Sequence, residues 1–154
     1  MKRPSGFTIV ELLIVIVVIG ILAAIVIVAF NGVQERSRLA SMQSDLQSIN
    51  KAIMMYHADE GHYPYMGTTG GNVTGATLNI SGLVPEYMAK MPRIPSGAGG
   101  YYAYIWSANG ADYKLVRLVN TNETLPASEA ALPNKDTTRS GRGWGYWSPG
   151  GSGI

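Results

Sequence analysis

The sequence predicts an α+β protein whose long amino-terminal helix, about residues 7–60, packs along its second half against a small antiparallel β-sheet. Three observations predict this fold. Residues 7–30 form an apolar run in which Glu11 is the only charge. Apolar residues then recur every three or four positions as far as Tyr56, which is the period of an amphipathic helix. Finally, an Asn-Gly pair joins two segments rich in aromatic and β-branched residues, which predicts a β-hairpin over 101–120.

Composition limits the classes of function. At 154 residues the chain can form one modest domain, and 19 glycines, mostly beyond residue 61, predict that this domain is rich in loops. The absence of cysteine excludes disulfides, thiolate metal sites and cysteine catalysis. The net charge is +2, from 12 basic and 10 acidic residues, so it gives no support to general nucleic-acid binding.

The apolar run, residues 7–30, is long enough to cross a membrane, because as a helix it would extend about 36 Å. The apolar core of a signal peptide is shorter, about 7–15 residues, and precedes a small-residue cleavage pattern that is missing here. An ordinary anchor leaves Glu11 unexplained, because an ionised carboxylate is costly in hydrocarbon. Position alone leaves two interpretations open: a functional acid in the membrane, or one that reaches the interface.

The residues at the start of the run carry a specific motif. Residues 6–11 read Gly-Phe-Thr-Ile-Val-Glu and follow a short basic head that contains Lys2 and Arg3. This stretch closely resembles the processing site of type IV pilins and of type II secretion pseudopilins. Residues 20–25, Gly-Ile-Leu-Ala-Ala-Ile, match the later helix pattern of the same family. The resemblance is specific over some 25 residues and implies the pilin fold for the chain.

The resemblance also implies a processing pathway. The leader, residues 1–6, is cleaved off between Gly6 and Phe7, and Phe7 is then N-methylated. Glu11 becomes the fifth residue of the mature chain and neutralises the amino terminus of a neighbouring subunit. Physical chemistry agrees with this role, because the freed amine is a cation that needs a carboxylate partner in apolar surroundings.

One position departs from the family pattern. Many pilins have a proline within the apolar helix, where it accompanies a segment that melts in the filament, and the corresponding residue here is Val28. Proline would remove a backbone donor, whereas Gly20 and the pair Asn31-Gly32 are weaker helix breakers. The sequence therefore predicts a helix with at most an interruption near residue 31.

Charges that flank the run predict its orientation in the membrane. Lys2 and Arg3 favour a cytoplasmic amino terminus. Arg36 and Arg38 favour the reverse, but Glu35 lies beside them and the leader motif is specific. We therefore expect a single-pass segment with its amino terminus in the cytoplasm.

Residues 31–60 form the amphipathic half of the helix. The apolar positions that share one face are Leu39, Met42, Leu46, Ile49, Ile53 and Tyr56. A small sheet packed on this stripe is favoured over a coiled-coil seam. Gly61 ends the helix, and the sequence Glu-Gly-His-Tyr-Pro at 60–64 is similar to the helix-end motif of pilins and pseudopilins.

Residues 61–154 are predicted to form a globular head. Its parts are a variable loop at 65–82, a short helical segment or turn at 83–91, the hairpin, and a carboxy-terminal region at 121–154. Within that region we expect one helical turn at 126–132 and a third strand around 143–148, because two strands alone are marginally stable. Tyr102, Tyr104 and Trp106 should share one face of their strand and Tyr101, Ala103 and Ile105 the other, and one of the two faces should cover the helix stripe. The last six residues should be mobile.

Candidate sites for metal or catalysis are weak. His57 and His62 are five residues apart across the helix end, which does not align them on one helical face. Some pseudopilins bind calcium after their strands, but Glu123, Glu129 and Asp136 are too scattered for a dense set of oxygen ligands. The chain also lacks nucleophile, phosphate-loop and zinc-protease motifs. We therefore expect no enzyme activity, no metal and no cofactor.

A basic and aromatic cluster lies near the carboxy terminus. Its members are Arg139, Arg142, Trp144, Tyr146 and Trp147. Such residues can stack on bases or sugars and contact phosphate, which makes Arg139, Arg142, Trp144 and Trp147 candidate contacts to DNA or another ligand. The favoured alternative is that Trp144 and Tyr146 alternate along a strand and pack against the sheet or a neighbouring subunit.

Together these features predict a structural subunit of a type IV pilus that acts in adhesion, twitching motility or DNA uptake. One alternative is a pseudopilin of a type II secretion system, and another is a minor tip subunit that binds DNA or a surface ligand. The resemblance implies as partners a prepilin peptidase and methylase, an assembly platform with its ATPase, and identical subunits. Before assembly the chain would lie in the membrane through residues 7–30, and afterwards in an extracellular pilus.

Overall fold

The computed structural model describes residues 6–67 and 69–154, and for residue 28 the backbone only. The chain divides into two compact units, one that ends at Ser37 and a head that comprises Arg38–Ile154. The sequence places the boundary between the apolar and amphipathic halves of the helix at residue 30, whereas the first compact unit ends at Ser37. The leader charges Lys2 and Arg3 lie outside the described residues.

A single helix, α1 (Ile9–Glu60), has 52 residues and runs through both units. The prediction of a helix at about 7–60 is confirmed to within two residues. The helix shows no interruption at Asn31-Gly32, and its backbone is helical at residue 28, where many pilins have proline. It ends at Gly61, whose φ is +76° and whose N–H donates to His57 O at 3.0 Å. This is a left-handed glycine cap, a conformation that favours glycine.

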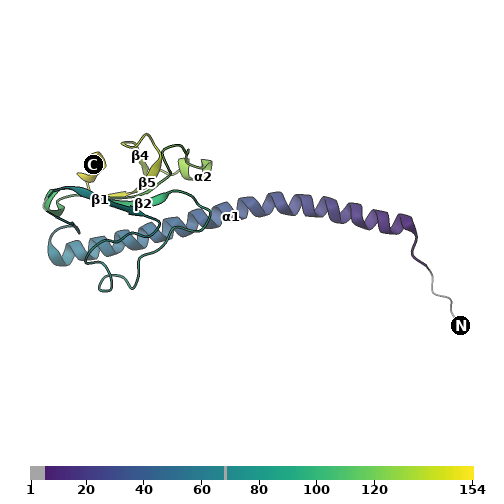
Figure 1. The fold of residues 1–154 in the computed structure, drawn as a ribbon, viewed down its shortest axis with the longest axis horizontal. Coiled ribbons are helices and arrows are strands. Elements are labelled where there is room, and N and C mark those ends of the chain that lie inside the picture. The colour runs from purple at the N-terminus through teal and green to yellow at the C-terminus, as the bar shows by residue number, and fades with distance from the viewer. Residues whose placement is uncertain (1–5, 68) are drawn as a thin grey trace. The chain divides into compact units, whose positions relative to one another are not determined.

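Among the described residues, five strands form one antiparallel sheet in the order β1-β2-β3-β5-β4. The strands are β1 (Gly71–Gly75), β2 (Tyr101–Trp106), β3 (Tyr113–Leu118), β4 (Lys135–Asp136) and β5 (Gly143–Trp147). Figure 1 shows this sheet over the second half of α1. The predicted hairpin and third strand are confirmed. The expectation of a loop throughout 65–82 was wrong, because β1 lies within it.

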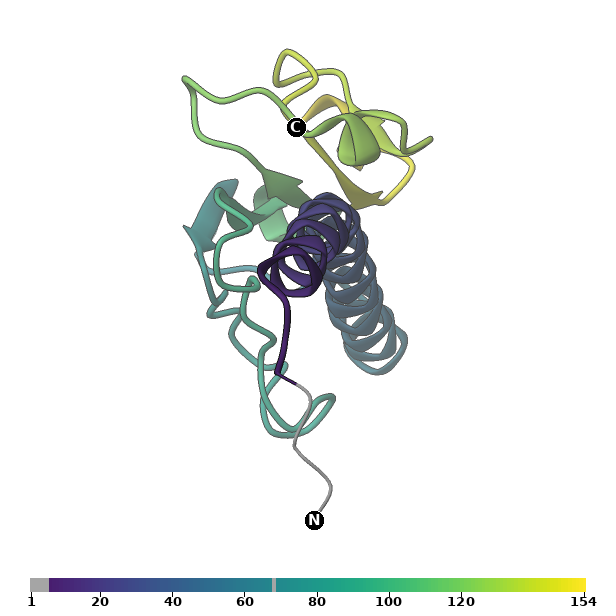
Figure 2. The ribbon, with the colours of Figure 1, turned by 90° about the vertical axis from the view of Figure 1, so that its right-hand side faces the viewer.

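The core of the head lies between α1 and one face of the sheet. The stripe residues Met42, Leu46, Ile49 and Ile53 are at most 2% exposed. They share one cluster with side chains of the facing strands, namely Tyr102, Tyr104, Trp106, Tyr113, Leu115 and Trp144. Figure 2, which views α1 nearly end-on, shows the strands and the carboxy-terminal segment on one side of the helix. The predicted contact between the helix stripe and one face of the hairpin is confirmed, and the face in contact is that of Tyr102, Tyr104 and Trp106.

The carboxy-terminal tail packs on the outer face of the sheet. Ile154 contacts the second apolar cluster, which comprises Ala103, Ile105, Val116 and Leu118. The Lys114 ammonium donates to Ser152 O at 3.0 Å, and Arg139 donates to Ile154 O at 3.1 Å. The expected mobility of the last six residues is therefore wrong, because apolar contact and two cationic donors hold the tail against the sheet.

Two short segments complete the head. Residues 81–87 form turns, and Tyr87 N–H and Met88 N–H both donate to Leu83 O. The helix α2 (Ala127–Ala130) follows the loop after β3, so the helical turn predicted at 126–132 is confirmed.

Candidate functional site

The amino-terminal junction of the motif lies just before α1. Gly6 and Phe7 are exposed and outside the helix, and the Phe7 side chain is 80% exposed. α1 begins at Ile9, which makes Thr8 its N-cap residue. The Gly6–Phe7 bond is therefore exposed and lies outside the helix, and Phe7 is one residue before the helix cap.

Thr8 and Glu11 form a capping box. The Glu11 N–H donates to Thr8 Oγ1 at 3.3 Å, and the Thr8 N–H donates to Glu11 Oε2 at 2.9 Å. The Thr8 hydroxyl also donates to the same carboxylate oxygen, at 2.7 Å. Each side chain thus satisfies a backbone donor that the helix start leaves free. Within the described part of the chain, Glu11 Oε1 has no hydrogen-bond partner.

The capping role of Thr8 was not predicted from the sequence. A signal was present, because a threonine followed three residues later by glutamate, ahead of an apolar run, is typical of a capping box. Glu11 therefore has a function within its own chain in addition to the one that the resemblance implies. The two functions are compatible, because the cap uses Oε2 only.

The apolar part of α1 presents its side chains to the surroundings. The exposed fractions of the large apolar residues between 9 and 27 range from 47% for Val18 to 84% for Ile9. An 18-residue window of α1 has a mean hydropathy of 3.6, so α1 is long and apolar enough to cross a membrane, a criterion that a signal sequence also meets. Such a surface is far larger than the apolar patches of monomeric proteins and needs lipid or other subunits to cover it.

The structure separates the basic and aromatic residues of the carboxy-terminal cluster. Trp144 is 1% exposed and donates through Nε1 to Glu129 Oε2 at 2.7 Å, so it is not available to stack on a ligand. Arg139 donates to Asp136 and to the tail, whereas Arg142 donates weakly to Val119 O at 3.4 Å. The inclusion of Trp144 among the candidate ligand contacts is therefore wrong, because its ring lies in the core.

The remaining candidate ligand contact, Trp147, is half-buried on β5. The Lys114 ammonium lies over its ring, 5.8 Å from the centroid. The packing against the sheet that was favoured for Trp144 is observed, because the Trp144 ring lies in the core cluster between the sheet and α1.

The carboxylates considered for calcium have separate partners. Glu123 accepts from Asn120, Glu129 contacts Arg117 and Trp144, and Asp136 contacts Lys114. Among the described residues, no group of three or more His, Cys, Asp or Glu side chains could hold a metal ion. The two histidines contact aromatic rings, since His57 stacks on Tyr63 at 4.2 Å and His62 lies 4.9 Å from the Tyr65 ring.

Two buried cations on β3 were not foreseen from the sequence. Arg117 is 0% exposed and lies 3.5 Å from Glu129, and Lys114 is 1% exposed and lies 3.3 Å from Asp136. In the sequence they look like the polar residues of an exposed strand face. Their partners are 12 and 22 residues further along the chain, so no local pattern could have indicated the pairs.

Asp136 should make the stability of the head fall in acid. Burial raises the pKa of this carboxyl, but hydrogen bonds from Thr138 and the charge of Lys114 outweigh it, so the net pKa lies below the ordinary value. A depressed carboxyl pKa contributes stability that is complete above the unfolded pKa, about 3.9, and is lost as pH falls through the folded pKa. We expect Asp136→Asn to reduce the slope of unfolding free energy against pH below about pH 4.

Asp45→Asn provides a control of opposite sign. Burial raises the pKa of Asp45 above its ordinary value. The contribution of this carboxyl to the free energy of unfolding therefore increases as pH falls. Denaturant unfolding between pH 2 and pH 6 measures both variants. A slope that Asp136→Asn leaves unchanged would contradict the account of the Lys114–Asp136 pair.

Comparison with known proteins gives consistent matches. Residues 1–27 match the family model described as the prokaryotic N-terminal methylation motif. The chain is 32% identical over 104 residues to the type II secretion system core protein G of Aeromonas hydrophila, an alignment that covers 62% of this chain and 70% of that protein. It is 36% identical over 126 residues to the core protein G of Klebsiella michiganensis, covering 75% and 77%.

The core protein G of Escherichia coli is 39% identical over 99 residues, covering 64% of this chain and 58% of that protein. Shorter alignments also occur, such as that with the core protein G of Pectobacterium carotovorum, which covers 40% of this chain and 40% of that protein. No solved structure gives a match.

The fold and the site define a pilin-like subunit. Its features are an exposed Gly6–Phe7 junction, a capped apolar half-helix, and a small antiparallel sheet packed on the second half of the same helix. The relatives and the methylation motif agree with this class. The chain belongs to the pilin and pseudopilin family.

Proposed function

We propose that the chain is a pseudopilin, the structural subunit of a filament of the type II secretion kind. The observation that carries this proposal is the similarity to core protein G, which reaches 126 residues and so extends well beyond the amino-terminal motif into the head. The type IV pilus favoured from the sequence and the pseudopilus share the same amino terminus, and the names of the relatives favour the pseudopilus.

The geometry of the amino terminus supports assembly in two stages. Before processing, the exposed apolar surface between residues 9 and 27 would be covered by lipid. After cleavage between Gly6 and Phe7, subunits would leave the membrane and cover the same surface with one another's helices. The free oxygen of Glu11 is then available to the amine of Phe7 on a neighbouring subunit.

The partners follow from this proposal. A prepilin peptidase and methylase acts on Gly6 and Phe7, and an assembly platform with its ATPase extracts the subunits. The chain has a cytoplasmic amino terminus before assembly and contributes structure, not catalysis, to the filament. DNA has no part in the proposal, because Trp144 is buried.

The proposal is tested by producing the full chain in a bacterium that has a complete type II secretion machinery but lacks its own core protein G. We expect mass spectrometry to detect a mature chain that begins with N-methylated Phe7, and secretion to be restored. Overproduction should give short filaments anchored in the envelope.

A matched control replaces Gly6 by valine, which should block cleavage and leave the mass of residues 1–6 on the chain. Long surface filaments without restored secretion would contradict the pseudopilin proposal and favour the type IV pilus.

A further inference from the structure

Charged side chains of the head gather by sign at its two ends, whereas the exposed Lys51 lies on α1 between them. One end is where α1 enters the head at Arg38, and the other is where α1 stops at Glu60. Basic side chains gather at the first end and carboxylates at the second. We call these the basic end, with Arg38, Arg93, Lys135 and Arg142, and the acidic end, with Asp59, Glu60 and Glu86.

Contacts within the head locate the first part of the basic end. Arg38 Nη1 donates to Gly97 O at 3.4 Å. Gly97 and Gly99 line a pocket of about 400 Å³ together with the exposed Arg93. A Cβ atom on Gly99 would lie 3.7 Å from Glu123 Oε2, so the loop that contains Glu123 is next to this pocket.

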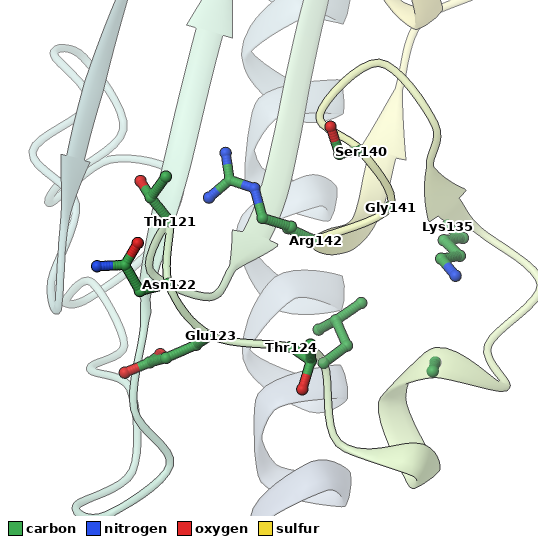
Figure 3. Close-up of a pocket in the computed structure, with 10 residues that line it drawn as sticks. Thr121, Asn122, Glu123, Thr124, Lys135, Ser140, Gly141 and Arg142 are labelled. Atoms are coloured by element: carbon green, nitrogen blue, oxygen red, sulfur yellow. The ribbon is translucent and has the colours of Figure 1, made fainter.

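The rest of the basic end surrounds a second pocket, of about 490 Å³, which Glu123, Lys135 and Arg142 help to line. Figure 3 shows Arg142 and Lys135 on separate segments of its wall. Glu123 is the only acidic residue that lines either pocket, and Asn120 holds its carboxylate through a side-chain bond of 2.9 Å and a backbone bond of 3.2 Å. Within the described residues, the Lys135 ammonium has no ion-pair partner.

The acidic end is equally one-sided. Asp59 and Glu60 are the last two residues of α1, and both are exposed. The Tyr87 ring lies 5.5 Å from that of Tyr56 near the end of α1, which brings the exposed Glu86 to the same end. The segments 56–65 and 82–87 contain no lysine or arginine, and the exposed Lys90 is the first basic residue that follows them.

This division does not serve the isolated head. Carboxylates at the carboxy terminus of a helix are disfavoured by the helix dipole, which prefers cations there. The ends are also too far apart to attract each other within one molecule, because the 22 residue-to-residue steps from Arg38 to Glu60 span about 33 Å of helix. The screening length at physiological salt is only about 8 Å. Opposite charges at opposite ends do, however, complement each other between molecules that point the same way.

We infer that the acidic end of one head docks on the basic end of a second copy of this chain, with the Asp59 and Glu60 carboxylates at Lys135 and Arg142. The inference rests on the proposed filament, because helices bundled in parallel bring unlike ends of successive heads together. The apolar half-helices would supply most of the binding free energy, and the charged ends would select the axial alignment.

Charge reversal tests the docking in the full chain, expressed with the secretion machinery. We expect Lys135→Glu with Arg142→Glu, and separately Asp59→Lys with Glu60→Lys, each to reduce filament yield by at least about fivefold, because like charges then meet. All four substitutions together should restore the yield to within about twofold of the parent chain. Lys51→Glu is the matched control, an exposed lysine on α1 between the two ends, and should leave the yield unchanged.

The outcomes separate this inference from the proposed function. Failure of the parent chain to form filaments would overturn both, whereas parent-like yield in the charge variants would overturn only the docking. Loss at the basic end that the acidic-end substitutions do not rescue would show another occupant, such as an acidic exported protein, and would also overturn it. Lys135→Glu alone tests the docking with a variant that should fold normally, because the Lys135 side chain has no hydrogen bond or ion pair among the described residues. Mass spectrometry of Phe7 verifies equal processing.

Discussion

Glu129→Ala should lower the free energy of unfolding of the head by about 3–5 kcal/mol, because it removes the charged partner of a buried arginine. Glu129 is 3% exposed, lies 3.5 Å from Arg117 and accepts from Trp144 Nε1 at 2.7 Å. Without it, Arg117 keeps only the bond from Nη2 to Ala98 O at 2.9 Å. The loss is a large part of the 5–15 kcal/mol that stabilises a typical domain.

Arg117 makes this position unusually sensitive. Its Nε and Nη1 atoms are buried and already have no hydrogen-bond partner within the described residues. Burial also lowers the pKa of the Arg117 guanidinium, which Glu129 opposes by favouring the charged form. An arginine in this state has little left to compensate its desolvation once the carboxylate is removed.

Two further variants identify the cause of the loss. Replacing both partners, with Arg117→Met and Glu129→Leu, should be less destabilising than Glu129→Ala, because no unpaired buried charge remains. Glu123→Ala, in the exposed loop after β3, should cost less than about 1 kcal/mol. Denaturant unfolding followed by tryptophan fluorescence measures all three in the full chain in detergent. A change below about 1 kcal/mol for Glu129→Ala would show that the pair contributes little.

The elements that could be predicted are those with a complete local signal. The helix stripe repeats over five turns, and Gly61 ends it with the positive φ that favours glycine there. The hairpin depends on Asn109 and Gly110, whose φ values of +57° and +65° fit the residue types that tolerate them. These features follow from neighbouring residues, so a single sequence is enough to locate them.

The elements that could not be predicted depend on distant partners. β1 reads Gly-Asn-Val-Thr-Gly, which has the composition of a loop, and it is a strand because it pairs with β2 some 30 residues later. The carboxy-terminal tail is likewise ordered by Lys114 and Arg139. In the site, the motif indicates Gly6, Phe7 and Glu11, whereas the bonds between Thr8 and Glu11 are local contacts that the family motif does not indicate.

Glu11→Gln should reduce filament assembly by at least about tenfold while leaving the start of α1 intact. Glutamine at this position can still accept from the Thr8 N–H, since capping boxes use glutamate or glutamine there. It cannot neutralise the amine of Phe7 on a neighbouring subunit, and removing one partner of a buried pair leaves the other charge uncompensated. Assembly should fail at growth of the filament, because membrane insertion depends on the apolar run.

Comparison with Glu11→Ala and Thr8→Val separates the charge of Glu11 from its capping role. Glu11→Ala removes both the carboxylate and the cap, whereas Thr8→Val removes the threonine hydroxyl that bonds to Glu11 and leaves the charge. If the charge is what assembly requires, Glu11→Gln and Glu11→Ala should fail alike and Thr8→Val should assemble at a reduced but measurable level. Filament yield by electron microscopy, with membrane fractionation as the control for insertion, distinguishes these cases. Normal yield from Glu11→Gln together with failure of Glu11→Ala would mean that Glu11 acts through the helix cap alone, and the pairing between subunits would have to be abandoned.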